Sequence, residues 1–354
     1  MPEIRIPHPP TPSAPGVFPP ERPLTPKSEV SAVRKYLMAR GNSAFTDRAF
    51  HVLMVMCALS IFGLVALILT ELMLRSQLSW KTFGLAFFAN VPNALGSYWD
   101  PVNGHFSAIP FIYGTLVSSI GALLISVPLA IGLAIFLTEM SPGFLRGPLA
   151  FVTELLAAIP SIIYGLWAMF VLVPLLRDYV NPLLVKYLGW TGLFADDNPT
   201  GLGYLAASVI LAIMILPIIS SLTREVMTAV PHSQREAVLA LGATRWEMIR
   251  MGVLRNARIG IVGAVILGLG RAIGETMAVT MVIGNTPEIH KSLLSNGASM
   301  ASVIANEFSE AVSDLHRSAL LQIGLALFIV TIIVNALARL LVWAVTRGAP
   351  ARVQ

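Results

Sequence analysis

Two opposite charges lie four residues apart inside a long apolar stretch of the sequence. They are Arg271 and Glu275, and the stretch Ile259–Ile283 is predicted to be a membrane-spanning helix. With a rise of about 1.5 Å per residue, both charges lie near or just past the middle of the bilayer. A charge at that depth costs about 3 kcal/mol or more, so both side chains should face protein or water and not lipid. Their spacing places them on one helical face, where they can form an ion pair.

This charged pair has two interpretations. In the first, Arg271 is a waypoint for an anion, because a guanidinium is permanently charged and its planar donors match an oxyanion. Glu275 then keeps the attraction weak enough for release. In the second, the pair only holds helices together. Glu154, in the third predicted span, is a weaker candidate for the pathway, and Glu139, at the end of the second span, is expected to be solvated.

No other pattern predicts catalysis, a metal site or a bound cofactor. The glycines around Arg271 have the wrong spacing for a dinucleotide-binding turn, and the Gly-Lys-Ser/Thr of an ATP-binding loop does not occur. The single cysteine can form neither an intrachain disulfide nor a Cys-rich metal site. His105, His290 and His316 are dispersed between the predicted spans and are expected on the surface. We therefore expect no catalytic residue, no metal and no cofactor, and hence a protein that is not an enzyme.

The composition indicates a polytopic, all-α membrane protein. Of 354 residues, 55% are hydrophobic and 12% are charged, and the mean hydropathy is +0.74. Soluble proteins carry about 25% charged residues, so this chain cannot cover a soluble surface. A lipid-exposed backbone must bond within its own helix, and six segments are long and apolar enough to span as helices. These segments are Ala49–Leu74, Ile109–Leu137, Leu149–Leu176, Leu202–Leu222, Ile259–Ile283 and Ala319–Trp343. Prolines 128, 160, 174 and 217 lie inside them and predict kinks.

The distribution of positive charge orients these spans. With the N-terminus in the cytoplasm, 17 Lys and Arg residues fall in cytoplasmic segments and 6 in outer loops. This bias predicts that both termini are cytoplasmic. It also accounts for the basic pI of 9.6 without nucleic-acid binding.

The segments outside the spans complete the predicted domain organisation. Ten prolines fall within residues 1–31, which are therefore predicted to be a disordered, proline-rich cytoplasmic tail. Residues 32–108 hold an interfacial segment, the first span and an outer loop. Residues 109–343 form the transmembrane core with a cytoplasmic loop at 223–258, and residues 344–354 form a second cytoplasmic tail.

The cytoplasmic loop carries signals for two short helices. Ser233 and Glu236 have the S-x-x-E spacing of a capping box, so a helix should begin after Ser233. Gly242 tolerates a positive φ and should end that helix. Thr244 and Glu247 repeat the capping-box spacing and should begin the second helix.

Apolar residues on these two helices predict a packing surface. Trp246, Ile249 and Val253 fall on one face of the second helix, and Ala237 and Leu241 belong to the first. Helices this short are marginal alone in water and need something to pack against. That surface is either the chain's own helix ends or another subunit.

The first helix of the loop resembles a known motif. The run from Glu236 and Ala237 to Gly242 resembles the EAA loop of ABC importer permeases. In that family the loop forms coupling helices that dock into a groove on the ATPase subunit. This chain departs from the motif at Val238, Gly252 and Arg255. These departures leave the glycine and the capping pattern intact.

The resemblance is more specific in the fifth span. Gly268–Val279, followed by Ile283–Asn285, resembles the fifth helix of the PstC-type permease of the phosphate-specific importer. Ala158–Trp167 and Ala305–Phe308 are similar to the same subunit. The resemblance runs from about Trp99 to Trp343 and leaves out the proline-rich tail.

This resemblance implies a fold, a function and partners. The implied fold is the six-helix ABC type I importer permease in the bacterial cytoplasmic (inner) membrane. The implied function is inward movement of inorganic phosphate by alternating access, with ATP hydrolysed on a separate subunit. The implied partners are a second permease subunit (PstA type), an ATPase dimer (PstB type), an extracytoplasmic phosphate-binding protein (PstS type) and membrane lipid. Arg271 and Glu275 match the family's charged pair. The implied coupling residues are Ser233, Glu236, Ala237, Leu241, Gly242, Thr244, Trp246 and Glu247.

Alternatives from other classes remain open. A permease for another oxyanion, sulfate or molybdate, fits the same residues, because specificity in such importers is expected to rest largely with the binding protein. A secondary transporter could use Glu275 as a proton site, and a channel could use Arg271 as an anion filter. Neither of these last two explains the ordered cytoplasmic loop.

Overall fold

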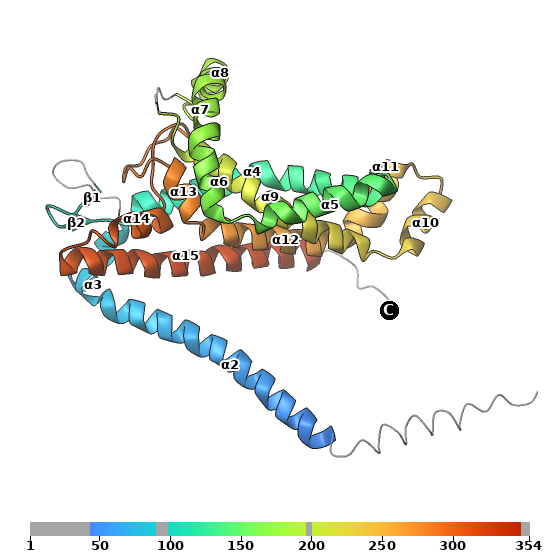
Figure 1. Cartoon of the computed structure of the whole chain (residues 1–354), viewed down its shortest axis with the longest axis horizontal. Coiled ribbons are helices and arrows are strands. Elements are labelled where there is room, and N and C mark those ends of the chain that lie inside the picture. The colour runs from blue at the N-terminus through green and yellow to red at the C-terminus, as the bar shows by residue number, and fades with distance from the viewer. Residues whose placement is uncertain (1–42, 90–97, 196–199, 348–354) are drawn as a thin grey trace, which may run out of the picture. The chain divides into compact units, whose positions relative to one another are not determined.

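Helices dominate the structure, a computed structural model that describes residues 43–89, 98–195 and 200–347. The predicted tail at 1–31, most of the interfacial segment and residues 348–354 of the second tail lie outside the described residues. The chain divides into two units, 1–66 and 67–354, and α2 crosses the division. The helices are α2 (Ser43–Arg75), α3 (Gln77–Phe83), α4 (Ile109–Ile135), α5 (Gly143–Ala158), α6 (Ser161–Trp167), α7 (Val173–Leu175), α8 (Asn181–Leu188), α9 (Tyr204–Thr228), α10 (His232–Ala240), α11 (Arg245–Glu247), α12 (Arg255–Ile273), α13 (Met277–Val282), α14 (Met300–Glu307) and α15 (Asp314–Arg347), with strands β1 (Trp99–Asp100) and β2 (His105–Phe106) (Figure 1).

Six helical segments in the described residues are long and apolar enough to cross a membrane, as predicted. The expected all-α membrane fold is therefore confirmed, and the spans near α2, α4, α9 and α15 lie close to their predicted positions. The third and fifth spans lie elsewhere. The six segments are Phe45–Arg75, Ile109–Met140, Ser161–Thr191, Tyr204–Thr228, Arg245–Ile273 and Asp314–Leu340.

The predicted third span, Leu149–Leu176, is wrong because it crosses a break in the chain. Helix α5 ends at Ala158, and Ile159 is extended, with ψ of 131°. Pro160 lacks an N–H, and its ring keeps the preceding residue out of the helical region. The helix that is long enough to span begins only at Ser161. From there the chain turns away from the direction of α5 (Figure 1).

The predicted fifth span, Ile259–Ile283, is wrong at both ends. The helix begins at Arg245 and continues through a π-helical segment, Met248–Leu254, into α12. It ends at Ile273, because the Gly274 and Glu275 N–H groups bond to the carbonyls of Gly270 and Ala272 at 3.3 and 3.4 Å. The bond from the Glu275 N–H to the Ala272 carbonyl spans only three residues and so tightens the last turn. Glycine at position 274 is also a poor helix former. A new short helix, α13, follows.

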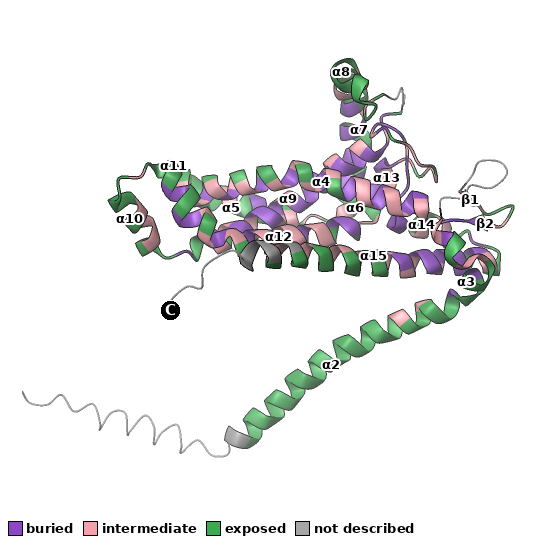
Figure 2. Ribbon diagram, turned by 180° about the vertical axis from the view of Figure 1, so that it is seen from behind, coloured by how far each residue is buried: buried purple, intermediate pink, exposed green. Residues whose placement is uncertain are grey.

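Helix α9 carries the core of the larger unit. Its inward side chains are fully or almost fully buried, among them Tyr204, Ile210, Ile215 and Ile219. They pack with residues of α4, α12 and α13 in one apolar cluster. Figure 2 shows buried residues concentrated on α9 and on the helix faces turned toward it. The remaining faces of this unit expose large apolar side chains, as lipid or another membrane subunit would require.

The two ends of the larger unit differ in character. The β1–β2 hairpin, α3 and α14 lie at one end of α15, whereas α10 and α11 lie at the other (Figures 1 and 2). At the hairpin end, Trp99 and Phe106 pack edge to face, and the His316 ring stacks on Phe106. His316 is 7% exposed, so its predicted surface position is wrong. Tertiary packing of the hairpin against α15 covers it.

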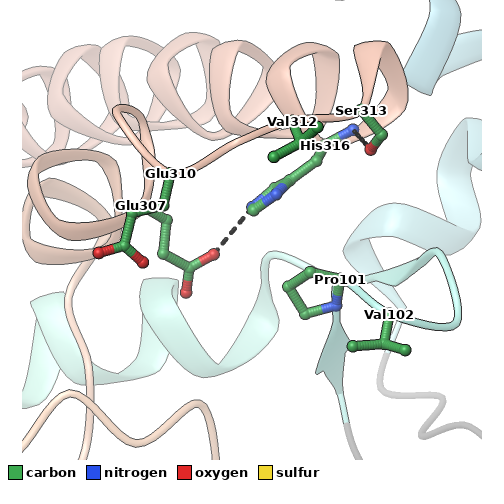
Figure 3. Close-up of a pocket in the computed structure, with 7 residues that line it drawn as sticks. All are labelled: Pro101, Val102, Glu307, Glu310, Val312, Ser313 and His316. Atoms are coloured by element: carbon green, nitrogen blue, oxygen red, sulfur yellow. Dashed lines mark hydrogen bonds and ion pairs between the residues drawn. The ribbon is translucent and has the colours of Figure 1, made fainter.

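One carboxylate organises this aromatic cluster. Glu307 Oε2 accepts hydrogen bonds from Trp99 Nε1 at 2.7 Å and from His316 Nε2 at 2.9 Å. Glu307 and His316 line a cavity of about 530 Å³, which Glu310 and Val312 also line (Figure 3). Glu307 therefore satisfies two largely buried donors at the edge of the hairpin.

We expect Glu307→Ala to destabilise the protein by about 2 kcal/mol or more, since two buried donors lose their acceptor. Glu310→Ala is the matched control, because Glu310 is exposed on the same cavity wall and its loss should cost no more than about 0.5 kcal/mol. Thermal unfolding of the purified protein in detergent measures both. Equal shifts of the two variants would contradict this role for Glu307.

Candidate functional site

Arg271 lies in the last turn of α12, and its side chain is exposed. Its electrostatic neighbour is Tyr164 of α6, a helix that begins just after the break at Pro160. A guanidinium that is exposed on a membrane helix must face water, lipid headgroups or another subunit. The structure therefore places a permanent cation on an open face beside the start of α6.

Glu275 does not pair with Arg271. Among the ion pairs of the described residues none joins these two side chains, so the expected i,i+4 pair is wrong. The reason is that α12 ends between them, at Ile273. The Glu275 carboxylate instead turns to the start of α13 and accepts a long hydrogen bond, 3.5 Å, from the Ala278 N–H. A helix N-terminus favours such a negative charge.

The two interrupted helices meet beside Arg271. Gly165 of α6 lies against α13, where an added Cβ would be 2.7 Å from Met281 Sδ and 3.0 Å from Ala278 Cα. On the other side of the break, the Tyr164 hydroxyl donates to the Leu156 carbonyl at 2.7 Å. The helices that follow the two breaks, α6 and α13, therefore pack against each other. The spans themselves were predicted as continuous, and the signals that mark the breaks are Pro160 and the glycine after Ile273.

The predicted coupling residues form one exposed surface. All eight of them, Ser233, Glu236, Ala237, Leu241, Gly242, Thr244, Trp246 and Glu247, are exposed. The two largest apolar side chains in this set are Leu241, 88% exposed, and Trp246, 60% exposed. Large contiguous apolar patches are typical of interaction surfaces, so this pair of side chains is a candidate for one.

The local structure of this loop follows part of the predicted pattern. Thr244 and Glu247 form a complete capping box, and Gly242 has φ of +82°, as a helix-ending glycine requires. Ser233 does not cap: α10 begins at His232 after Pro231, with no side-chain cap. Pro231 occupies the N-cap position with an extended backbone, ψ of 142°, and has no side-chain acceptor to offer.

The apolar residues of the loop divide between two surfaces. Ile249 and Val253 are buried, 4% and 0% exposed, in a cluster with the ends of α4 and α9. The sequence predicted that Trp246 lies on the same face as Ile249 and Val253. This prediction is wrong, because Trp246 is exposed while the other two are buried. The loop therefore packs on the chain's own helix ends with one face and leaves the other face uncovered.

Two acids outside the predicted pair are ion-paired. Glu154 of α5 pairs with Arg224 of α9 at 2.6 Å. Glu139, expected to be solvated, is only 9% exposed and pairs with Arg235 of α10 at 3.0 Å. Glu139 lies beneath the packed loop, which the sequence around it does not show. Among the residues that the structure describes, no group of acids, histidines or cysteines could hold a metal ion.

The chain belongs to the family described as the binding-protein-dependent transport system inner membrane component, whose profile matches residues 126–347. It is accordingly a multi-pass membrane component of a transport system and not an enzyme, as expected. Its six apolar helices agree with that class.

Proteins similar in sequence to this chain include phosphate transport system permeases from several bacteria. The phosphate transport system permease protein PstC of Haemophilus influenzae is 45% identical over 87% of this chain and 96% of its own length. The PstC proteins of Mesorhizobium japonicum and Pasteurella multocida are also 45% identical, over 84% and 80% of this chain and 90% and 88% of theirs. A solved structure of the inward-facing MetNI methionine ABC transporter aligns with a TM-score of 0.49 and 18% identity, over 67% of this chain and 95% of that one, which is too distant to support an inference.

The contact between α6 and α13 gives a direct test of the site's geometry. Gly165→Ala should push the two helices apart, since its Cβ would lie 3.0 Å from the Ala278 backbone. We expect a lower melting temperature in detergent and impaired transport. Gly132→Ala on α4 is the control, because nothing lies within 4 Å of its Cβ and alanine favours a helix by about 1 kcal/mol. An unchanged Gly165→Ala variant would contradict the close packing.

Proposed function

We propose that this chain is a permease subunit of an ATP-driven importer that moves inorganic phosphate across the bacterial cytoplasmic membrane by alternating access. The observation that carries the substrate is the 45% identity to PstC phosphate permeases over most of both chains. The observation that carries the pathway is an exposed arginine where two interrupted membrane helices meet.

The proposed anion pathway passes Arg271. In many secondary transporters the substrate binds where spanning helices are interrupted, near the bilayer midplane, and we extend that geometry to this chain. A guanidinium there offers a planar set of charged donors to an oxyanion. Glu275 lies on the next segment of the chain and accepts a hydrogen bond from α13. Its negative charge therefore weakens the attraction of the site for an anion without pairing with Arg271. This geometry favours the pathway interpretation over an ion pair that only holds helices together.

The proposed coupling surface is the exposed face of the loop around Leu241 and Trp246. We assign its docking partner as the ATPase dimer of the importer, so both termini and this loop lie in the cytoplasm. The opposite end of the larger unit, with the β1–β2 hairpin and α14, would then face a phosphate-binding protein outside the membrane. A second permease subunit would cover the exposed apolar helix faces of this chain.

Uptake experiments distinguish phosphate from other oxyanions as the substrate. They also distinguish ATP hydrolysis from other energy sources. Cells that lack other phosphate importers and express the complete complex should take up radioactive phosphate only while the ATPase is active. Competition by sulfate or molybdate would favour another oxyanion. Uptake driven by a proton gradient, without ATP hydrolysis, would favour a secondary transporter instead.

Arg271→Gln should assemble normally, because the side chain is exposed and unpaired with Glu275, yet it should transport poorly. Losing charged hydrogen bonds worth about 1.5–3 kcal/mol corresponds to a roughly 10- to 100-fold fall in uptake. Arg271→Lys keeps the charge but not the planar donors, so its activity should be intermediate. The measurement is phosphate uptake per inserted complex. Near-normal uptake by Arg271→Gln together with Glu275→Gln would reject the pathway role.

Gly242→Val should uncouple the loop from the ATPase. Valine resists a φ of +82°, although nothing lies within 4 Å of a Cβ added there, so the effect is backbone strain and not a clash. We expect normal membrane insertion with reduced co-purification of the ATPase subunit. Gly63→Val, in a helix and with nothing near its Cβ, is the control. Wild-type co-purification and uptake in Gly242→Val would argue against the proposed coupling surface.

A further inference from the structure

A buried arginine links the first helix of the cytoplasmic loop to the end of α4. Arg235, near the start of α10, donates to Glu139 Oε1 from Nη2 at 3.0 Å and from Nε at 3.3 Å. The two side chains are 12% and 9% exposed. Charged groups so deeply buried persist only when they are paired and hydrogen-bonded, so each side chain holds the other in place.

The same guanidinium also holds the end of α9. Its Nη1 donates to the Val230 carbonyl at 2.5 Å and its Nη2 to the Met227 carbonyl at 2.9 Å. Met227 lies in the last turn of α9, where the negative end of the helix dipole favours a cation, and Val230 lies two residues past the end of the helix. One side chain therefore connects α10, the last turn of α9 and the end of α4.

The end of α4 carries the acid that Arg235 binds. Glu139 lies in a π-helical segment, Phe136–Met140, that terminates the helix. From there α4 runs back along α9 through the main apolar cluster toward the level of the interrupted helices. A second, weaker link joins α10 to α12, where Asn256 Nδ2 donates to Gln234 Oε1 at 2.5 Å. Both links lie on the packed side of the loop and leave Leu241 and Trp246 free.

We propose that Arg235 is a positioning residue that makes α10 and the adjacent ends of α4 and α9 move as one body. This inference rests on the proposed function, since it requires an ATPase docked on α10. Apolar side chains alone can slide past one another when a short helix is pushed. A buried ion pair cannot separate without leaving an uncompensated charge on each side, so a displacement of α10 is passed to α4.

The test uses the complete complex with its ATPase, second permease subunit and phosphate-binding protein in proteoliposomes. Phosphate uptake and ATP hydrolysis are measured on the same vesicles. The test variant is Glu139→Gln with Arg235→Gln, which removes both charges together and so leaves no lone buried charge. The control is Arg177→Gln with Asp178→Asn, which removes an exposed ion pair between α7 and α8 without touching α10.

We expect both double variants to assemble and to hydrolyse ATP. The phosphate imported per ATP hydrolysed should fall roughly fivefold or more in the test variant, the lower end of typical coupling between sites, and should stay unchanged in the control. A wild-type ratio in the test variant would overturn the inference. So would a loss of assembly in that variant, which would make the pair an anchor for folding, or an equal fall in the control.

Failure of the proposed function would appear elsewhere in the same experiment. Wild-type vesicles that import no phosphate with ATP would refute the function before any variant is compared. The role of Arg235 is judged only from the ratio between variants in vesicles whose wild type is active.

Discussion

Inside a bilayer every backbone N–H and C=O needs a partner within the protein, and this requirement decides where the helices of this chain can be interrupted. At the first break, Pro160 has no N–H to offer the Leu156 carbonyl four residues earlier. That carbonyl instead accepts from the Ile159 N–H at 3.4 Å and from the Tyr164 hydroxyl at 2.7 Å. The break is therefore stable in a place where an unpaired carbonyl would cost several kcal/mol. Tyr164 also interacts electrostatically with Arg271.

The second break meets the same requirement differently. Short-range backbone bonds close the end of α12, and the Glu275 carboxylate turns to the first N–H groups of α13. The absence of a side chain at Gly165 then lets α6 approach the α13 backbone. The two interrupted helices can thus pack closely together. Arg271 lies where they meet, and its charge is not consumed by the neighbouring acid.

The cytoplasmic loop follows the same rule at the helix ends. Arg235 donates to the Met227 carbonyl in the last turn of α9 and to the Val230 carbonyl just past it, and it also pairs with the buried Glu139. Because its packed face is held by these bonds and by the buried Ile249 and Val253, the loop can expose Leu241 and Trp246 on the other face. A loop with a packed, hydrogen-bonded inner face and an apolar outer face can bind a partner on the outside and transmit the partner's movement to the membrane helices.

The sequence by itself determined the features that depend on neighbours within one or two helical turns. Apolar length identified the membrane helices, the spacing of Thr244 and Glu247 predicted their capping box, and Gly242 predicted a positive φ. Only the tertiary structure decided that Pro160 breaks its span instead of kinking it, and that Glu275 turns away from Arg271. It alone brought Glu139 to Arg235, 96 residues further along the chain. These outcomes rest on contacts between distant segments, whose free energies exceed local preferences but leave no regular spacing in the sequence.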